Sequence, residues 1–198
     1  MYKIRRGVFL IRFALAWSAL LLLGTPAEGQ QLKVYYPAPE RLHLTDSGGN
    51  PFNERQLDGQ VWVANFFFTS CQGPCPLTMA QLAQLTRSLD GISDVRFLSI
   101  SIDPERDTPA RLTEYAAGIR QQDARWYVAV AELDHVTELI KDGFRVGQGG
   151  SVEAHSTTFV LVDAKRQIRG YYSGLRAEEM ERLEKDIRSL LEHEPQRK

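Results

Sequence analysis

One segment of the sequence, residues 61–102, most constrains the fold. It opens with a largely apolar run, Val61 to Phe68, and closes with a second, Val95 to Ile102, and each suits a buried strand. Between them, apolar residues recur at helical spacing until Gly91 supplies a C-terminal stop. A strand, a helix and a strand in this order predict a parallel crossover, and therefore an α/β fold.

The segments on either side of this unit are also patterned. Upstream, a turn cluster at residues 46–51 predicts a hairpin within residues 42–57. Downstream, Thr108–Pro109 predicts the start of a helix, and Trp126–Val130 suits a strand. Asp134 is expected to cap a short helix that ends at Gly143.

The C-terminal part completes the predicted architecture. Residues 157–163 and 168–172 predict an antiparallel hairpin, and residues 180–190 carry the apolar stripe of a closing helix. A crossover unit, then a hairpin and a closing helix, is the order of a thioredoxin-like fold. The predicted fold is thus α/β, with a central mixed sheet flanked by helices.

The first 29 residues have the composition of an export leader. Basic residues precede an apolar run from Phe13 to Leu23, and small residues precede a plausible cut before Gln30. The predicted organisation is a leader over 1–29, an extended lead-in over 30–41 and one domain over 42–198. The apolar run is short for a membrane span, but its extension back to Val8 leaves an uncleaved anchor as the alternative. We therefore expect an exported protein, periplasmic or anchored in the membrane and facing the extracytoplasmic side.

Composition narrows the function classes. The chain is 43% hydrophobic and 25% charged, as in ordinary globular proteins. Its formal charge of −1 becomes −4 without the leader's four basic residues and one acid, which argues against nucleic acid as a partner. The count of two cysteines excludes a disulfide-rich mini-protein and a zinc site built from three or four thiolates. In an exported protein the oxidation state of that pair is variable.

Cys71 and Cys75 lie in the string TSCQGPCP, between the end of the first predicted strand and the start of its helix. Sheets of this class gather ligands at this edge, and a helix N-terminus stabilises a thiolate. The alternative is a structural disulfide, but closing so short a loop gives only about 2 kcal/mol, against roughly 3 to 5 kcal/mol for longer loops. Helical Cβ atoms four residues apart are also about 5–6 Å from each other, whereas a relaxed disulfide needs about 3.5–4.5 Å. The sequence therefore favours a chemically active, redox-active pair.

The spacing directs both sulfurs to one side, which leaves room for an ion and suggests a third ligand among the histidines. His155 directly precedes the strand that opens the C-terminal hairpin, and in a thioredoxin-like order this loop faces the cysteines. Thioredoxins normally carry a cis-proline there, whereas this chain has no proline between Pro109 and Pro195. The other histidines have ordinary placements: His43 in a presumed edge strand, His135 after a helix cap and His193 in a charged tail.

The candidate ligand set favours copper over zinc. Two soft thiolates with an imidazole suit Cu(I), and the same set with a weak extra ligand can hold Cu(II). A structural zinc site would normally need a fourth protein ligand.

Three strings resemble the Sco/SenC family of copper-binding assembly factors: SCQGPCP after FFFTS, SIDPERDTP after the second strand, and HSTTFVLVD. The resemblance covers roughly Leu42 to Leu191. It implies a thioredoxin-like fold in which Cys71, Cys75 and His155 bind copper for the binuclear copper centre of cytochrome c oxidase. The implied partner is a copper-accepting subunit of that oxidase or another copper chaperone.

The cysteine segment departs from the family at one place. Gln72 stands where the family usually has a proline after the first cysteine, and Pro74 precedes the second cysteine instead. This changes the loop but removes no ligand.

Two function classes follow. The first is a metallochaperone that binds and hands over copper. The second is an extracytoplasmic thiol:disulfide oxidoreductase that reduces the cysteines of a copper-site partner and does not require His155. The three carboxylates of DPERD, at residues 103, 105 and 107, could support the site or a docking surface, or they could cap the next helix and face water.

Overall fold

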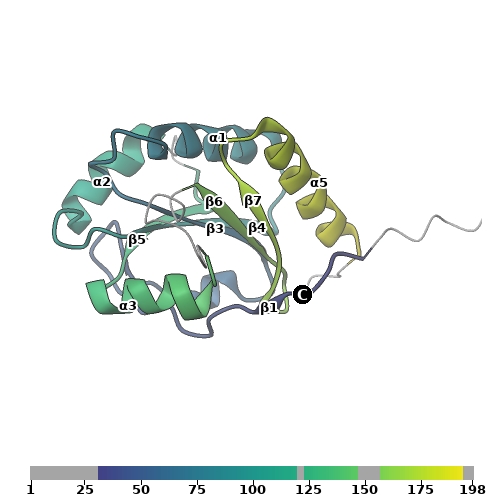
Figure 1. The fold of residues 1–198 in the computed structure, drawn as a ribbon, viewed down its shortest axis with the longest axis horizontal. Helices are drawn as coiled ribbons and strands as arrows, with labels where there is room; N and C mark the ends of the chain where they lie inside the picture. The colour runs from purple at the N-terminus through teal and green to yellow at the C-terminus, as the bar shows by residue number, and fades with distance from the viewer. Residues whose placement is uncertain (1–30, 120–122, 147–156, 194–198) are drawn as a thin grey trace, which may run out of the picture. The chain divides into compact units, whose positions relative to one another are not determined.

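The computed structural model describes residues 31–119, 123–146 and 157–193, and in this part of the chain a seven-stranded sheet is covered by helices on both faces (Figure 1). The strand order across the sheet is β1-β7-β6-β3-β4-β5-β2. The strands are β1 (Tyr36–Pro37), β2 (Thr45–Asp46), β3 (Val61–Phe67), β4 (Val95–Ser101), β5 (Trp126–Val130), β6 (Thr158–Val162) and β7 (Gln167–Ser173). The helices are α1 (Cys75–Ser88), α2 (Pro109–Ile119), α3 (Leu133–Glu138) and α5 (Ala177–His193), with a 3-10 helix at Glu54–Leu57 and a π-helix at Leu139–Gly143.

The predicted crossover forms the centre of the sheet. β3 runs parallel to β4, from the pair Val61↔Val95 to the pair Phe67↔Ser101. β4 in turn runs parallel to β5, whereas β6 pairs with β3 in the antiparallel direction. The sheet is therefore mixed, and the predicted thioredoxin-like architecture is confirmed.

Side chains of β3 alternate between two apolar cores. Val63 and Phe67 belong to the core shared with α1, α2 and α5, and Trp62 and Phe66 belong to the core shared with α3 and the π-helix. Figure 1 shows α1, α2 and α5 on one side of the sheet and α3 on the other. Because successive side chains of a strand point to opposite faces and both faces are covered, all of residues 61–67 are buried, and all but Asn65 are apolar.

The structure differs from the sequence prediction upstream of β3. The hairpin predicted over 42–57 is confirmed only around its turn, where Thr45 and Pro51 form an antiparallel bridge and the Phe52 N–H donates to the Leu44 carbonyl. The strand partner of β2 is β5. Residues 54–57 form the 3-10 helix, which begins where the Asn53 side chain accepts a hydrogen bond from the Arg55 N–H. The predicted turn at residues 46–51 is confirmed, but the strand that pairs with β2 lies far along the chain.

The lead-in is tied to the sheet edge. Its β1 pairs with β7, and the buried Arg169 of β7 donates hydrogen bonds to the carbonyls of Leu32 and Lys33. The same guanidinium forms an ion pair with Asp163, which is also buried. This anchoring fixes the chain from residue 32 onward.

The helix predicted to start at Asp134 begins instead at Leu133, and its N-cap residue, Glu132, makes no side-chain cap hydrogen bond. The helical path does continue to Gly143, as expected. Among the helices in the described ranges, none is long and apolar enough to cross a membrane. The predicted leader, residues 1–29, lies outside those ranges.

Candidate metal centre

The cysteines lie on the connection from β3 to α1, at the carboxyl edge of the central strands. Directly after β3, the Cys71 N–H donates to the Phe68 carbonyl at 3.2 Å, so the chain turns. Pro74 is the N-cap residue of α1, and Cys75 is the first residue of the helix. A proline also follows Cys75, in the first turn, where a missing N–H costs nothing. The sequence thus places one cysteine in the turn and the other at the helix start.

The two thiols differ in exposure. Cys75 is 1% exposed and belongs to the core on the α1 side of the sheet, whereas Cys71 is half-buried and packs against that same core. No disulfide joins them. The Thr78 hydroxyl donates to the Cys75 carbonyl at 3.0 Å, which secures the first helical turn. The structure therefore brings the predicted pair together at the start of α1.

Tyr115 of α2 also packs against the same core as both cysteines, and the sequence analysis did not single it out. Its ring stacks on Phe67, with centroids 5.2 Å apart and planes inclined by 15°. Burial raises the pKa of Tyr115 to about 12, and coulombic interactions with Cys75 and Cys71 add to the rise. Tyr115 lies three residues after Leu112 and directly before Ala116, on the buried face of α2. This helical spacing was the sequence signal that could have found it.

His155 lies outside the described residues, so the structure does not report on it. The chain is described again from Thr157, whose carbonyl accepts a hydrogen bond from the Gly174 N–H at 2.7 Å. A Cβ built on Gly174 would lie 2.9 Å from the Thr78 methyl group of α1. Thr157 therefore returns beside the first turn of the helix that begins with Cys75.

The other three histidines are engaged locally. The rings of His43 and His135 meet edge-on, 5.3 Å apart, and His135 Nε2 lies 2.9 Å from the Leu42 carbonyl. His193 Nδ1 lies 2.8 Å from the Ser189 carbonyl in α5. Within the described ranges, no three His, Cys, Asp or Glu side chains form a group that could hold a metal ion.

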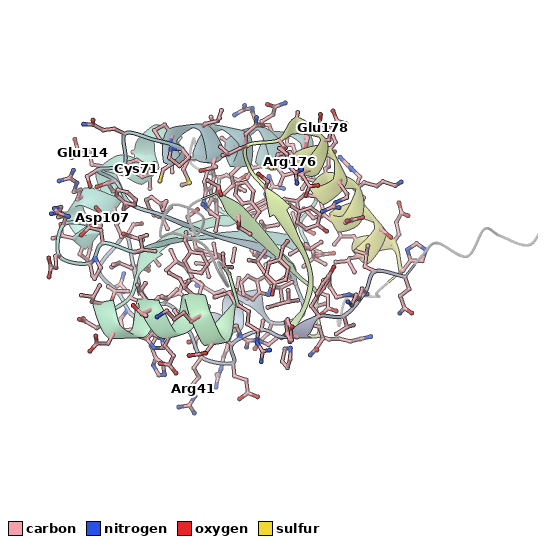
Figure 2. All side chains as sticks on the ribbon, viewed as in Figure 1. Arg41, Cys71, Asp107, Glu114, Arg176 and Glu178 are labelled. Atoms are coloured by element: carbon pink, nitrogen blue, oxygen red, sulfur yellow. The ribbon has the colours of Figure 1, made fainter. Side chains whose placement is uncertain are left out.

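The three carboxylates of DPERD have different environments: two lie near or at the surface, and the third is buried beside the cysteine segment. Asp103 forms an ion pair with the exposed Arg106 at 3.0 Å, and Glu105 is exposed. Asp107 is completely buried and contacts the segment that leads to Cys71. Figure 2 shows Cys71, Asp107 and Glu114 at the same end of the molecule.

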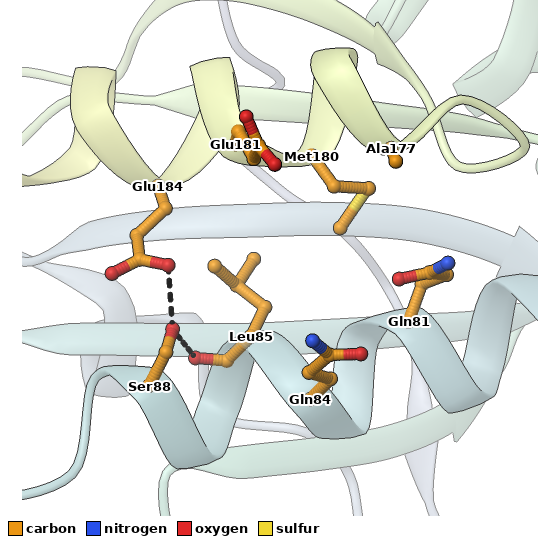
Figure 3. Close-up of a pocket in the computed structure, with 8 residues that line it drawn as sticks. All are labelled: Gln81, Gln84, Leu85, Ser88, Ala177, Met180, Glu181 and Glu184. Carbon is orange, nitrogen blue, oxygen red and sulfur yellow. Dashed lines mark hydrogen bonds between the residues drawn. The ribbon is translucent and has the colours of Figure 1, made fainter.

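A hollow between α1 and α5 is separate from the cysteines (Figure 3). The Ser88 hydroxyl bridges it by donating to Glu184 at 2.8 Å. Burial works to raise the pKa of Glu184, but hydrogen bonds from Arg188 and Ser88 outweigh it and lower the pKa. The residues that line the hollow are Gln81, Gln84, Leu85, Ser88, Ala177, Met180, Glu181 and Glu184. Neither cysteine is among them, so this hollow is not the candidate centre.

Comparison with known proteins decides the family. A family model described as SCO1/SenC matches residues 37–192, which is most of the chain. The chain belongs to the SCO1/SenC family. The resemblance carried by the cysteine string, SIDPERDTP and HSTTFVLVD is thereby confirmed.

The chain is similar to several members of the SCO1/SenC family along most of their length. It is 27% identical over 169 residues to the SCO1 protein homolog of Bacillus subtilis, covering 81% of this chain and 87% of the relative. The crystal structure of a SCO1/SenC family lipoprotein from Bacillus anthracis is similar with a TM-score of 0.65 and 28% identity, over 81% of this chain and 94% of that chain. The structure of yeast Sco1 with copper bound is similar with a TM-score of 0.61 and 25% identity, over 82% and 98% of the two chains.

Proposed function

We propose that this SCO1/SenC protein is a metallochaperone that binds copper through Cys71, Cys75 and His155. The observation that carries the proposal is the meeting of the two cysteines at the start of α1, where both pack against one core without a disulfide between them. When bound, copper would be held by soft donors and could pass to another protein by exchange of those donors. The yeast relative, which shares this fold, was solved with copper bound.

The assignment of His155 rests on chain connectivity. Thr157, two residues downstream, is hydrogen-bonded to Gly174, and Gly174 lies against Thr78 in the first turn of α1. A ligand two residues before Thr157 is therefore within reach of the cysteines, since each residue spans up to about 3.5 Å. An imidazole completes a donor set that suits Cu(I) and, with a weak further ligand, Cu(II).

The proposed destination of the copper is the binuclear centre of a respiratory cytochrome c oxidase. The partner would be the subunit that accepts the metal, or another copper chaperone. Residues 1–29 would direct export or remain as a membrane anchor, with residues 30–41 as lead-in and 42–198 as the domain on the extracytoplasmic side. The basic and apolar composition of the leader supports this location.

A thiol:disulfide oxidoreductase is the second candidate. Half-buried Cys71 and buried Cys75 give an accessible thiol next to a protected one, an arrangement that also suits reduction of a partner's disulfide. This function would need both cysteines but not His155.

Anaerobic titration of the reduced protein with Cu(I), in competition with a chromophoric Cu(I) chelator, tests the metal assignment. We expect one tightly bound copper per chain. Cys71→Ser and Cys75→Ser should each lose tight binding, whereas Ser88→Ala, at the other end of α1, should retain it. Full affinity in both serine variants would overturn the ligand assignment.

A further inference from the structure

Asp107 is a buried carboxylate that faces the cysteine segment from a different part of the chain. It lies between β4 and α2, and none of its surface is exposed. Its contacts reach the connection between β3 and α1, 38 residues earlier in the sequence. The contact therefore joins the SIDPERDTP string to the cysteine string.

Three hydrogen bonds converge on this carboxylate. The Thr69 N–H donates to Asp107 Oδ2 at 2.9 Å, and the Thr69 hydroxyl donates to Oδ1 at 2.5 Å. The Ser101 hydroxyl, from the end of β4, donates to Oδ2 at 2.5 Å. Thr69 is thus held through both its backbone and its side chain, and it lies two residues before Cys71.

The donors around Asp107 form an ordered chain. Arg111 Nε donates to the Thr69 hydroxyl at 2.7 Å, so that hydroxyl has its own proton left for Asp107. The Asp103 N–H likewise donates to the Ser101 hydroxyl at 3.2 Å. Every neighbour therefore donates toward the carboxylate, and only a group with two acceptor oxygens satisfies all of them. An asparagine at position 107 would replace one acceptor with a donor.

We propose that Asp107 is a positioning residue that holds the Cys71 loop in the arrangement of the reduced thiol pair. The two thiols are not bonded in this structure, and a disulfide would bring their sulfurs to about 2.05 Å of each other, so forming it requires Cys71 or the first turn of α1 to move. A loop fixed at Thr69 resists this movement. The Asp107 network therefore favours the dithiol over the disulfide, and it keeps both sulfurs available. This inference concerns the thiols alone. Only the further step, in which the two free sulfurs bind copper, rests on the function proposed above.

The test is the equilibrium of the full-length protein with glutathione. In that reaction, the two thiols lose two electrons and two protons to oxidised glutathione, which becomes two glutathione thiols. Thr69→Val removes the hydroxyl with little change in shape, and Asp107→Asn removes one acceptor. In both variants we expect the equilibrium constant to shift toward the disulfide by about tenfold, which is about 30 mV for a two-electron couple. Thr69→Ser keeps the hydroxyl and should restore the wild-type equilibrium.

Asp163→Asn provides the matched control. Asp163 is also a buried carboxylate, and it accepts three hydrogen bonds from Lys165, Gln167 and Arg169. Asp163 directly follows β6, whose last residue, Val162, pairs with Trp62 near the start of β3. The cysteines follow the other end of β3, so Asp163 is far from them. This variant should lower the thermal midpoint without moving the thiol equilibrium. Thr69→Val keeps the proposal testable if Asp107→Asn does not fold, because Thr69 is partly exposed.

Two results would overturn the proposal. One is a wild-type thiol equilibrium in Thr69→Val and Asp107→Asn despite a lowered thermal midpoint, since Asp107 would then act on stability alone. The other is a shift toward the dithiol, which would mean that the network favours the disulfide. Neither measurement uses copper. A wild-type protein that fails to bind Cu(I) would therefore refute the proposed metallochaperone function and leave this inference to its own test.

Discussion

Arg169 Nη1 lies 2.6 Å from Asp163 Oδ2, and both side chains are almost completely removed from solvent. Arg169 also donates to the Leu32 and Lys33 carbonyls. One buried cation thus joins β7, the turn before it and the lead-in of the chain.

Replacing Arg169 with methionine should destabilise the protein by about 3–5 kcal/mol, because the change leaves the Asp163 carboxylate buried without its partner. Urea unfolding measures this change. Arg188→Met is the control, since the Arg188–Glu184 pair of α5 is partly exposed and should contribute less than about 1 kcal/mol. Equal effects in the two variants would contradict the importance we assign to the buried pair.

Two glycines should respond to alanine in opposite directions. A Cβ on Gly174 would lie 2.6 Å from the Phe159 ring, so Gly174→Ala should cost about 1–3 kcal/mol through overpacking. Gly118 lies in α2 with nothing within 4 Å of its Cβ position, so Gly118→Ala should stabilise the helix by up to about 1 kcal/mol. Calorimetric midpoints distinguish the two. A stabilised Gly174→Ala variant would show that the space around Phe159 is looser than described.

Stability should fall in alkaline solution because of Tyr172. Burial raises the pKa of this tyrosine, and its hydroxyl donates to Asp186 at 2.7 Å. An unfolded tyrosine ionises near pH 10, so the stabilisation is complete below that pH and is lost above it, at about 1.4 kcal/mol per pH unit. Tyr172→Phe should be less stable at neutral pH but should lose less stability above pH 10. Urea unfolding in steps of pH checks this, and equal slopes for the two proteins would rule it out.

The proposed role of His155 predicts a selective defect. His155→Ala should lower Cu(I) affinity at least about tenfold, since even residues that only support a metal ligand have effects of that size. The dithiol reduction potential should stay close to wild type because both sulfurs remain. His193→Ala is the control, because His193 is engaged within α5. An unchanged copper affinity in His155→Ala would favour the oxidoreductase function.

Oxidation and copper binding should exclude each other, since a disulfide removes both thiolates. Cu(I) should raise the thermal midpoint of the reduced protein. At a free copper concentration one hundred times Kd, binding adds about 2.7 kcal/mol to the free energy of unfolding. The oxidised protein should show no shift. The measurement is a set of melting curves recorded without oxygen, and an equal rise in both forms would place the copper away from the cysteines.

The central part of the fold could be predicted because its signals are local. The apolar run of β3 and the spacing of Met79 and Leu82 in α1 each report burial within one segment. β2 could not be predicted in the same way, because its two residues pair with β5 and carry no period of their own. Residues 54–57, expected to be the end of a hairpin, form a 3-10 helix that begins at the Asn53 side chain.

The candidate site shows the same division. The position of Cys71 and Cys75 between a strand and the start of a helix could be predicted. The contact between Thr69 and Asp107 could not, because it spans 38 residues and depends on the turn after β4. Tyr115 was visible only as one more residue on the buried face of α2, and its stacking on Phe67 depends on how that helix lies across the sheet.

The unequal burial of the two sulfurs imposes an order in time on any exchange with another molecule. Collisions from solvent reach Cys71, while Cys75 is 1% exposed at the start of α1. A reagent or a partner therefore forms its first bond at Cys71, and Cys75 reacts only with what Cys71 already holds or after the first turn opens. The first step of such an exchange therefore takes place at the turn, and the second takes place at the start of the helix.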